Sequence, residues 1–267
     1  MLSALTLQDK KESETKLCKI ILKFGDLTAK EVNDHRESCE QGAGFIWLKG
    51  GSLNQSKAMR HQQAYMGYVS NYTRPHGEES PFTLFHSRFP SEGEVSKLNI
   101  QPFKGQEIAF CHNGTMTRDE LFWANVGLRI PFTGGESDSL LMFRILQTMD
   151  LKTMIALLKR MDQNFVLVHQ PTETIHILGR FEFELAKAKT RIISARNIYT
   201  GDTYEIITDY KGKVLKCKVE EEKKYSSWGG SNYHMTSNGY WDRDDKITKI
   251  ESDYLSGDYT EAAKQIK

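Results

Sequence analysis

The order of helical and strand-like segments is the sequence feature that most constrains the fold of this chain. Three segments with helical patterning, residues 117–127, 137–149 and 151–161, lie between an earlier and a later group of apolar strand-like runs. The later group, in residues 164–220, is rich in β-branched residues and is interrupted by turn sequences such as PTET and YKGK. Strands joined by short hairpins pair antiparallel, so this order predicts an α+β fold with two mainly antiparallel sheets between helical layers.

The first part of the chain contains the earlier strands. Apolar runs at residues 16–24, 45–49, 81–89 and 107–114 predict strands, and the second of them ends at the turn pair Gly50-Gly51. Helices are predicted at residues 29–39, where Thr28 and Glu31 have the spacing of a capping box, and at the polar residues 56–68.

The composition sets the two ends of the chain apart from the predicted core domain, residues 18–222. Residues 1–17 are polar and charged and lack the apolar stretch of a secretory signal, so we expect a leader or propeptide-like extension. Residues 223–267 begin with a stretch rich in Ser, Gly, Asn and aromatic residues that has no periodicity, which predicts a flexible tail that could end in one helix.

Charge and hydropathy exclude several classes of partner. The formal net charge is +1, which gives no global field to attract nucleic acid or an anionic membrane. The chain has no run of about 18 apolar residues, the length that a membrane-spanning helix needs, so we expect a cytoplasmic protein. The four cysteines are scattered without a CxxC pair, so we expect neither a metal site nor a disulfide framework.

Unusual polar residues follow the points where apolar strands stop. They occur in residues 85–103, 109–115 and 133–143. Each feature has an ordinary structural explanation: a strand-end Arg is usually a surface ion pair, an Asn-Gly pair is usually a turn, and a Ser at a helix start is usually a cap. The three together, in this order, are much more specific.

Together they resemble the class II glutamine amidotransferase domain, whose pattern is an N-terminal Cys, a His-Thr-Arg-Trp/Tyr-x-Thr-x-Gly segment, a His-Asn-Gly segment and a Ser-Asp pair. The matching residues are Cys18, then His86-Ser87-Arg88-Phe89-Pro90-Ser91-Glu92-Gly93, then His112-Asn113-Gly114, and then Ser137-Asp138. The resemblance covers roughly residues 18–200. It implies the four-layer αββα sandwich of N-terminal-nucleophile hydrolases, L-glutamine as substrate, and no metal or other cofactor. The stand-alone layout also resembles, more weakly, amidotransferase-like proteins that phages encode.

The chemistry of a free amino acid fits these residue types. Its carboxylate and ammonium need one bidentate cation and one anion, roles that suit Arg88 and Asp138. Ser91 is expected to add a hydroxyl contact to the carboxylate. We also expect Phe89, as an aromatic wall, and His112 to line the substrate pocket.

Attack on the side-chain amide builds negative charge on its oxygen. Preorganised donors at that oxygen lower the barrier by about 3 kcal/mol each in known hydrolases. The side-chain amide of Asn113 and the backbone N–H of Gly114 suit this role, because a glycine leaves the N–H of a sharp turn accessible.

Cys18 is the predicted nucleophile, and in this class its own α-amine is the base. An α-amine has a pKa of about 7.7–8.0, which suits proton transfer near neutral pH. The mechanism therefore requires cleavage of the Leu17–Cys18 bond. Lys19 departs from the family pattern, which has a glycine after the nucleophile. The remaining cysteines are expected to be ordinary thiols: Cys39, Cys111 and Cys217.

The resemblance implies hydrolysis of glutamine to glutamate and ammonia through a Cys thioester, with transfer of the ammonia to an acceptor. The sequence has no P-loop and no GxGxxG after a strand, so we expect a synthase or acceptor-binding partner protein, or the tail, to supply the acceptor site. Two alternatives stay open. One is an inactive amidotransferase-fold protein that acts as an amino-acid-binding or protein-interaction module, which residues 1–17 and Lys19 favour. The other is a hydrolase of the same type that acts on a different amide.

Overall fold

A computed structural model describes residues 18–33, 41–72, 80–89, 93–131, 134–187 and 191–220. The predicted leader and tail, and with them Ser91 and Cys39, lie outside the described residues. The domain boundaries at residues 18 and 222 therefore stay predictions.

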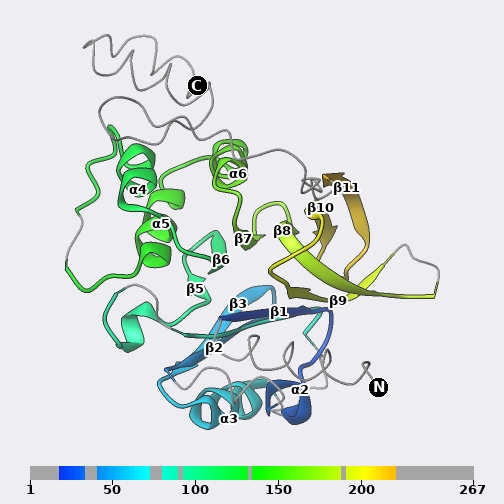
Figure 1. Cartoon of the computed structure of the whole chain (residues 1–267). Coiled ribbons are helices and arrows are strands. Elements are labelled where there is room, and N and C mark those ends of the chain that lie inside the picture. Colours follow the sequence, from blue (N-terminus) through cyan, green and yellow to red (C-terminus); the bar gives the residue numbers. More distant parts are fainter. Residues whose placement is uncertain are drawn as a thin grey trace, which may run out of the picture. The chain divides into compact units, whose positions relative to one another are not determined.

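Strands dominate the described part of the chain (Figure 1). The strands are β1 (Lys19–Lys23), β2 (Ala43–Lys49), β3 (Ser52–Ala58), β4 (Thr83–Ser87), β5 (Phe103–Lys104), β6 (Ile108–Asn113), β7 (Asn164–His169), β8 (Thr174–Leu185), β9 (Ile192–Asn197), β10 (Thr203–Asp209) and β11 (Val214–Glu220). The helices are α2 (Ala29–Asn33), α3 (His61–Tyr72), α4 (Arg118–Ala124), α5 (Asp138–Leu146), α6 (Leu151–Arg160) and the short 3₁₀ helix η1 (Lys97–Asn99). No helix in the described ranges is long and apolar enough to cross a membrane.

Within the described ranges all strand pairs are antiparallel, and they form one continuous eleven-stranded sheet in the order β3-β2-β4-β1-β9-β8-β7-β6-β5, with β10 pairing to both β8 and β11. Two separate sheets were predicted. The strands are joined because β8 is long: residues 174–180 pair with β10, whereas residues 181–185 pair with β9. β8 therefore belongs to both halves of the sheet.

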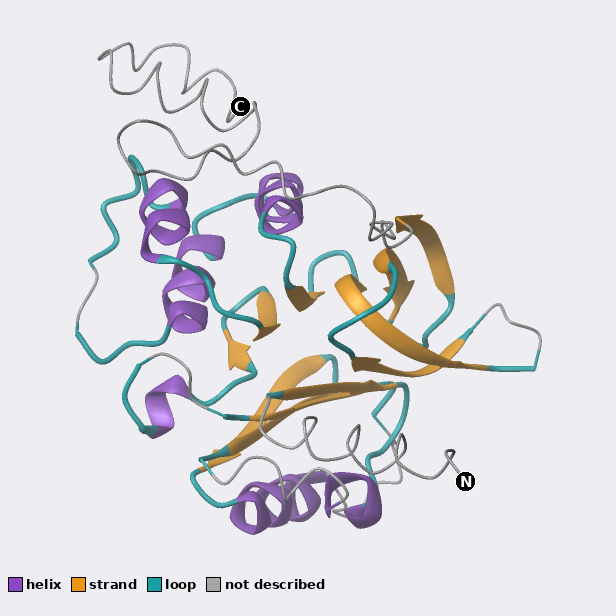
Figure 2. Cartoon of the chain, in the orientation of Figure 1, coloured by secondary structure: helices purple, strands orange, loops and turns teal. Residues whose placement is uncertain are grey.

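Three clusters of buried side chains show how the elements pack. The first joins β1 and β4 to β6 and β7, so the sheet is folded with its two halves facing each other across this cluster. The second cluster lies between β6, β7 and helices α4 to α6, and the third lies between β1, β2, β4 and helix α3. Figure 2 shows the helices on both sides of the strands.

The prediction of a helix at residues 56–68 was wrong in its first part. Residues 52–58 form β3, which makes a hairpin with β2 through Gly50 and Gly51, both at positive φ. β3 lies at the end of the sheet order and is only partly buried, so polar residues such as Asn54 and Gln55 are tolerated in it and hide the strand pattern. Helix α3 begins only at His61.

Other local predictions are confirmed. The backbone N–H of Thr28 donates to Glu31 Oε2 at 2.8 Å, and the N–H of Glu31 donates to Thr28 Oγ1 at 3.3 Å, as the capping-box spacing indicated. The helix that follows is described as far as Asn33. The hairpin strands β7 to β11 also form where they were predicted.

Candidate active site

The pairing of β1 with β4 brings Cys18 to Arg88 and Phe89. Lys19 is opposite Ser87, so the residue before β1 meets the residues after β4. The N–H of Phe89 donates to Cys18 Sγ at 3.0 Å, and Cys18 Sγ also lies 3.0 Å from the carbonyl oxygen of Phe89. Cys18 is half-buried, and Phe89 is exposed beside it.

Asn113 reaches the same place from the end of β6. Its side-chain amide donates to the carbonyl oxygen of Cys18 and also contacts the hydroxyl oxygen of Tyr199 at 3.1 Å. The Tyr199 hydroxyl donates to the same Cys18 carbonyl at 2.7 Å. Two donors from distant parts of the chain thus fix the backbone at Cys18.

Tyr199 was missed in the sequence. It follows β9, which pairs antiparallel with β1. In this pairing Ile21 is opposite Arg196, so the same register, continued by three residues, brings Tyr199 opposite Cys18. An exposed aromatic residue after a strand carries no local signal of this role. Only the long-range pairing of β1 with β9 identifies it.

Arg88 is 3% exposed and its backbone N–H donates to the carbonyl oxygen of Gly42 at 2.9 Å. Its guanidinium donates to the carbonyl oxygen of Glu94 at 3.2 Å. Burial lowers the pKa of Arg88, and the charges of Cys18 and Asp138 act in the opposite direction. The guanidinium is therefore within electrostatic reach of Cys18 and Asp138, two other predicted site residues.

Asp138 is the first residue of α5 and is 7% exposed. Its carboxylate accepts from the backbone N–H of Met116 at 2.8 Å and from that of Ser139 at 2.6 Å. Ser137 caps the helix, as predicted, by accepting from the N–H of Leu140 at 3.2 Å. The start of α5 thus holds the Asp138 carboxylate against the turn that follows β6. The partial positive charge at the N-terminus of the helix stabilises the negative carboxylate.

The segment after Arg88 is tied to the start of α5 by the buried side chain of Asn99. The Asn99 amide donates to the carbonyl oxygens of Glu94 (2.9 Å) and Gly135 (2.7 Å), and its oxygen accepts from the N–H of Ser137 at 2.8 Å. Asn99 therefore links the Arg88 side of the site to the Asp138 side.

His112 is buried, and both of its ring nitrogens contact protein groups. Nδ1 lies 2.9 Å from Ser139 Oγ and Nε2 lies 3.1 Å from Gln163 Oε1. Burial lowers the pKa of His112, so the ring is neutral near pH 7. These contacts favour a supporting position behind the Asn113-Gly114 turn, and direct contact with a substrate stays a prediction.

His86 is fully buried, and neither ring nitrogen has a hydrogen-bond partner among the residues that the structure describes. Burial is the main reason why its pKa falls to about 3, and the nearby His112, Arg88 and His61 lower it further. Cys111 is buried as well, which raises the pKa of its thiol well above the usual range. Of these buried groups, neither supplies a charged nucleophile or base near neutral pH.

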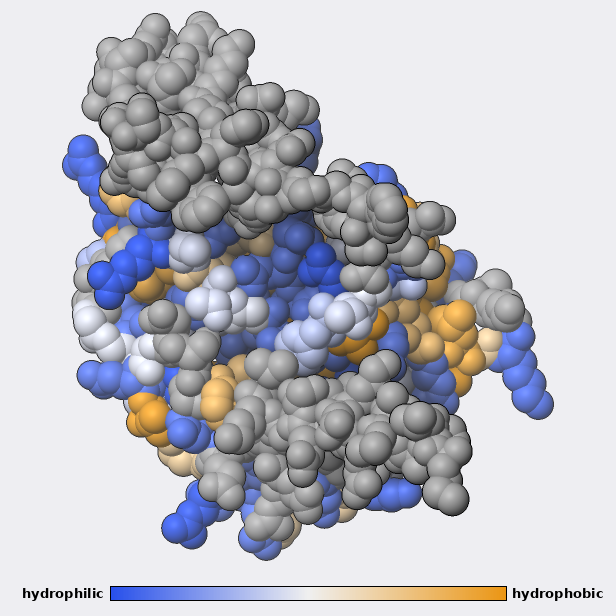
Figure 3. Space-filling model, in the orientation of Figure 1, coloured by the Kyte–Doolittle hydropathy of each residue, from blue (hydrophilic) through white to orange (hydrophobic). Residues whose placement is uncertain are grey.

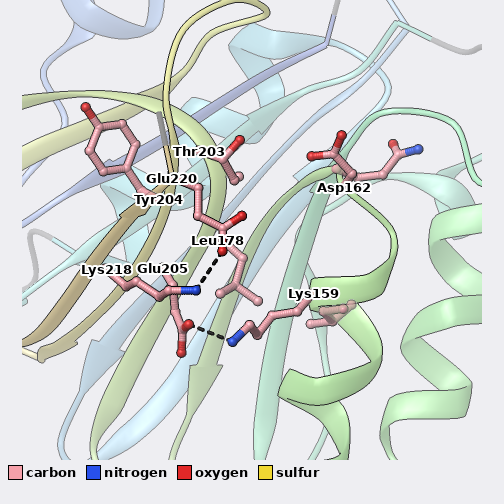
Figure 4. A pocket seen from close by; sticks show the side chains of 11 residues that line it. Lys159, Asp162, Leu178, Thr203, Tyr204, Glu205, Lys218 and Glu220 are labelled. Carbon is pink, nitrogen blue, oxygen red and sulfur yellow. Dashed lines mark hydrogen bonds and ion pairs between the residues drawn. The ribbon is translucent and has the colours of Figure 1, made fainter. Parts of the chain in front are cut away.

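Cys18 does not line either of two surface pockets in the described part of the chain. A pocket of about 200 Å³ lies between α6, β8, β10 and β11, where Lys159 pairs with Glu205 and Lys218 pairs with Glu220, each at 2.7 Å (Figure 4). Gln163, the partner of His112, also lines this pocket.

An apolar area is visible beside β8 and β11 in Figure 3, and these strands carry the exposed side chains Leu185, Leu215 and Val219.

Among the described residues, no group of three or more His, Cys, Asp and Glu side chains is arranged to hold a metal ion.

Comparisons with known proteins support the fold. No protein-family model matches the sequence. No curated protein matches it either. A solved structure of glutamine phosphoribosylpyrophosphate amidotransferase from B. subtilis, complexed with ADP and GMP, matches 76% of this chain with a TM-score of 0.53 and 14% sequence identity. The match spans 49% of that structure, about half of its length.

A glutamine aminotransferase class-II domain protein from Silicibacter pomeroyi matches 76% of this chain and 99% of its own, with a TM-score of 0.48 and 12% identity. At 14% identity, the likeness to the B. subtilis structure establishes a shared fold. The resemblance inferred from the sequence is thus confirmed at the level of the fold, whereas the likeness to phage proteins has no support from the B. subtilis structure.

Proposed function

We propose that this chain is a class II glutamine amidotransferase domain that hydrolyses glutamine and releases ammonia for transfer to an acceptor. One observation carries the proposal: Asn113 donates to the carbonyl oxygen of Cys18, and the Arg88 guanidinium is within electrostatic reach of Cys18 and Asp138, so residues from separate elements lie near one another. The fold supports it, because the folded sheet between α3 on one side and α4 to α6 on the other suits the four-layer αββα arrangement of N-terminal-nucleophile hydrolases.

Substrate recognition follows from the two buried charges. The Arg88 guanidinium binds the α-carboxylate of glutamine, and the Asp138 carboxylate binds the α-ammonium. Both groups are largely withdrawn from water, which strengthens their attraction for a zwitterion. Ser91 and Phe89 are proposed to line the same pocket.

The reaction is a nucleophilic substitution at the side-chain amide. The α-amine of a processed Cys18 takes the thiol proton, and the sulfur attacks the amide carbon. The oxyanion of the tetrahedral intermediate accepts hydrogen bonds from the Asn113 side chain and the Gly114 N–H. The C–N bond then breaks, the leaving nitrogen takes the proton and departs as ammonia, and water hydrolyses the thioester to glutamate.

The contacts of Asn113 are compatible with this role. Its side-chain amide has two N–H groups, one on the Cys18 carbonyl and one on the Tyr199 hydroxyl. The first fixes the nucleophile's backbone. The second is available to the substrate oxygen once Tyr199 turns aside.

A direct assay tests the proposed function. We expect purified protein to convert L-glutamine to glutamate with an equal amount of ammonia, and to leave L-asparagine unchanged, because a side chain shorter by one methylene does not bring its amide to Cys18 while Arg88 and Asp138 hold the other end. No release of ammonia from glutamine by protein that begins at Cys18 would refute the proposal.

Arg88→Lys tests the carboxylate contact. The substitution keeps the charge but loses the planar fork that binds a carboxylate bidentately. We expect glutamine or glutamate to bind about tenfold more weakly, since the loss of one charge-assisted hydrogen bond costs about 1.5 kcal/mol. Calorimetry on the folded variant measures this. Unchanged affinity would remove Arg88 from the site.

A binding module without catalytic activity is the second candidate. Residues 1–17 precede Cys18, and an uncleaved chain has no α-amine to act as base. Lys19 also differs from the family glycine, and its ammonium lies 5.5 Å from the centre of the Tyr199 ring. If the chain is instead an active amidotransferase, the nitrogen acceptor is supplied by a partner protein or by the tail. A hydrolase of another amide, the third candidate, has no need for the Arg88 and Asp138 pair.

A further inference from the structure

Gln163 lies directly against the turn that is proposed to stabilise the oxyanion. Asn113 at the end of β6 is opposite Asn164 at the start of β7, so the residue before β7 meets the residue after β6. Gln163 Oε1 lies 3.1 Å from His112 Nε2, and its amide nitrogen donates to the carbonyl oxygen of Thr115 at 2.8 Å. One side chain thus bridges the residues on both sides of Asn113-Gly114.

The fit between Gln163 and Gly114 is close. Gly114 has φ +151°, and a Cβ at this position would overlap Gln163 Oε1. A glycine is therefore required for the turn to pack under the glutamine. The side chain of Gln163 thus packs against Gly114, whose N–H is proposed to donate to the substrate oxygen.

We propose that Gln163 is a positioning residue, which holds the Asn113-Gly114 turn in the orientation needed for the oxyanion. This inference rests on the proposed function. Gln163 does not itself contact the nucleophile among the described contacts. It acts through His112 and Thr115, the two neighbours of the turn.

The same bridge fixes the proton on His112. The donation to Thr115 directs the amide nitrogen of Gln163 away from the ring, so Oε1 faces His112 and can only accept. In the neutral ring, Nε2 then carries the hydrogen and Nδ1 is left as an acceptor, 2.9 Å from the Ser139 hydroxyl oxygen, which also lies 3.1 Å from Asp138 Oδ1. Because the Ser139 backbone N–H donates to Asp138, the bridge also reaches the ammonium-binding carboxylate.

Gln163→Leu is the informative variant, since it keeps a similar volume and removes both hydrogen bonds. We expect kcat for glutamine to fall about 30-fold with KM within about threefold, because misplacing a transition-state donor reduces turnover more than ground-state binding. In ¹⁵N NMR spectra we expect the Nε2–H tautomer of His112 to lose its dominance and the amide signal of Gly114 to shift.

Gln170→Leu is the matched control. Gln170 stands beyond the other end of β7, and its amide donates to the carbonyl oxygen of Gly51 at 2.9 Å, the same type of bond far from the turn. We expect its kcat and the His112 and Gly114 signals to match the unchanged protein. Gln163→Glu is a second variant, which keeps the acceptor for His112 but cannot donate to Thr115, and should fall between Gln163→Leu and the unchanged protein.

The outcomes separate this inference from the proposed function. If the unchanged protein has no glutaminase activity, the proposed function fails, and the NMR signals alone then decide whether Gln163 orders the turn. If Gln163→Leu keeps the His112 tautomer, the Gly114 signal and any activity of the unchanged protein, Gln163 does not position the turn. If Gln163→Leu does not fold, the same comparison with Gln163→Glu decides.

Discussion

Replacing Cys18 with alanine is expected to abolish both the labelling of the protein by an electrophilic glutamine analogue and the cleavage of the Leu17–Cys18 bond. The thiol is the attacking atom in both reactions, and alanine provides none. Intact mass spectrometry measures both effects at once. For the unchanged protein we expect a species that begins at Cys18 and gains one equivalent of the analogue.

Cys217→Ala is the control for this experiment. Cys217 is an exposed cysteine on β11, so it reports non-specific alkylation, and its loss should leave cleavage and stoichiometric labelling intact. Cys111 is buried with a raised pKa, so it should not react. Labelling at Cys111 or Cys39 would mean that the fold was assigned correctly and the nucleophile was not.

The N-terminus itself distinguishes the two main functions. If the natively produced protein keeps Met1 or Leu2 and resists the analogue, the chain lacks the amine base and the enzyme proposal fails. The binding-module candidate then takes its place. Binding of glutamine by such a protein would still depend on Arg88 and Asp138, because recognition of a zwitterion does not require the thiol.

Local signals in the sequence predicted much of the structure near the site. The apolar runs placed Cys18 just before β1 and Arg88 just after β4, and the Ser137 cap located the start of α5. These features depend on residues that are close in the sequence. A strand forms on an apolar run, and a helix cap forms where a side chain reaches the backbone of the next turn. Sequence reasoning is strongest for such short-range causes.

The missed features depend on contacts between distant segments. Tyr199 meets Cys18 only because β9 pairs with β1, and Gln163 meets Gly114 only because β7 pairs with β6. Likewise, β3 is an edge strand whose polar residues resemble a helix surface until its pairing with β2 is known. Neither a propensity nor a local pattern contains the register of such pairs.

Asn113→Ala is expected to lower kcat for glutamine by about a hundredfold, equivalent to about 2.7 kcal/mol of transition-state stabilisation, and to leave KM nearly unchanged. The reason is that the amide donor meets full negative charge only after the thiol has attacked. Steady-state kinetics with the folded variant measures both constants. A larger effect on KM than on kcat would instead make Asn113 a turn residue.

Tyr199→Phe separates the two roles that Asn113 has in the structure. Both side chains donate to the carbonyl oxygen of Cys18, so both variants weaken the hold on the backbone at Cys18. Of these two side chains, only that of Asn113 is proposed to donate to the oxyanion. If holding Cys18 were its whole contribution, Tyr199→Phe would reduce kcat about as much as Asn113→Ala does. If Asn113 stabilises the oxyanion, Tyr199→Phe should cost less than about tenfold, because a single neutral hydrogen bond contributes about 1 kcal/mol. The ratio of the two losses therefore measures how much of the effect of Asn113 belongs to the transition state.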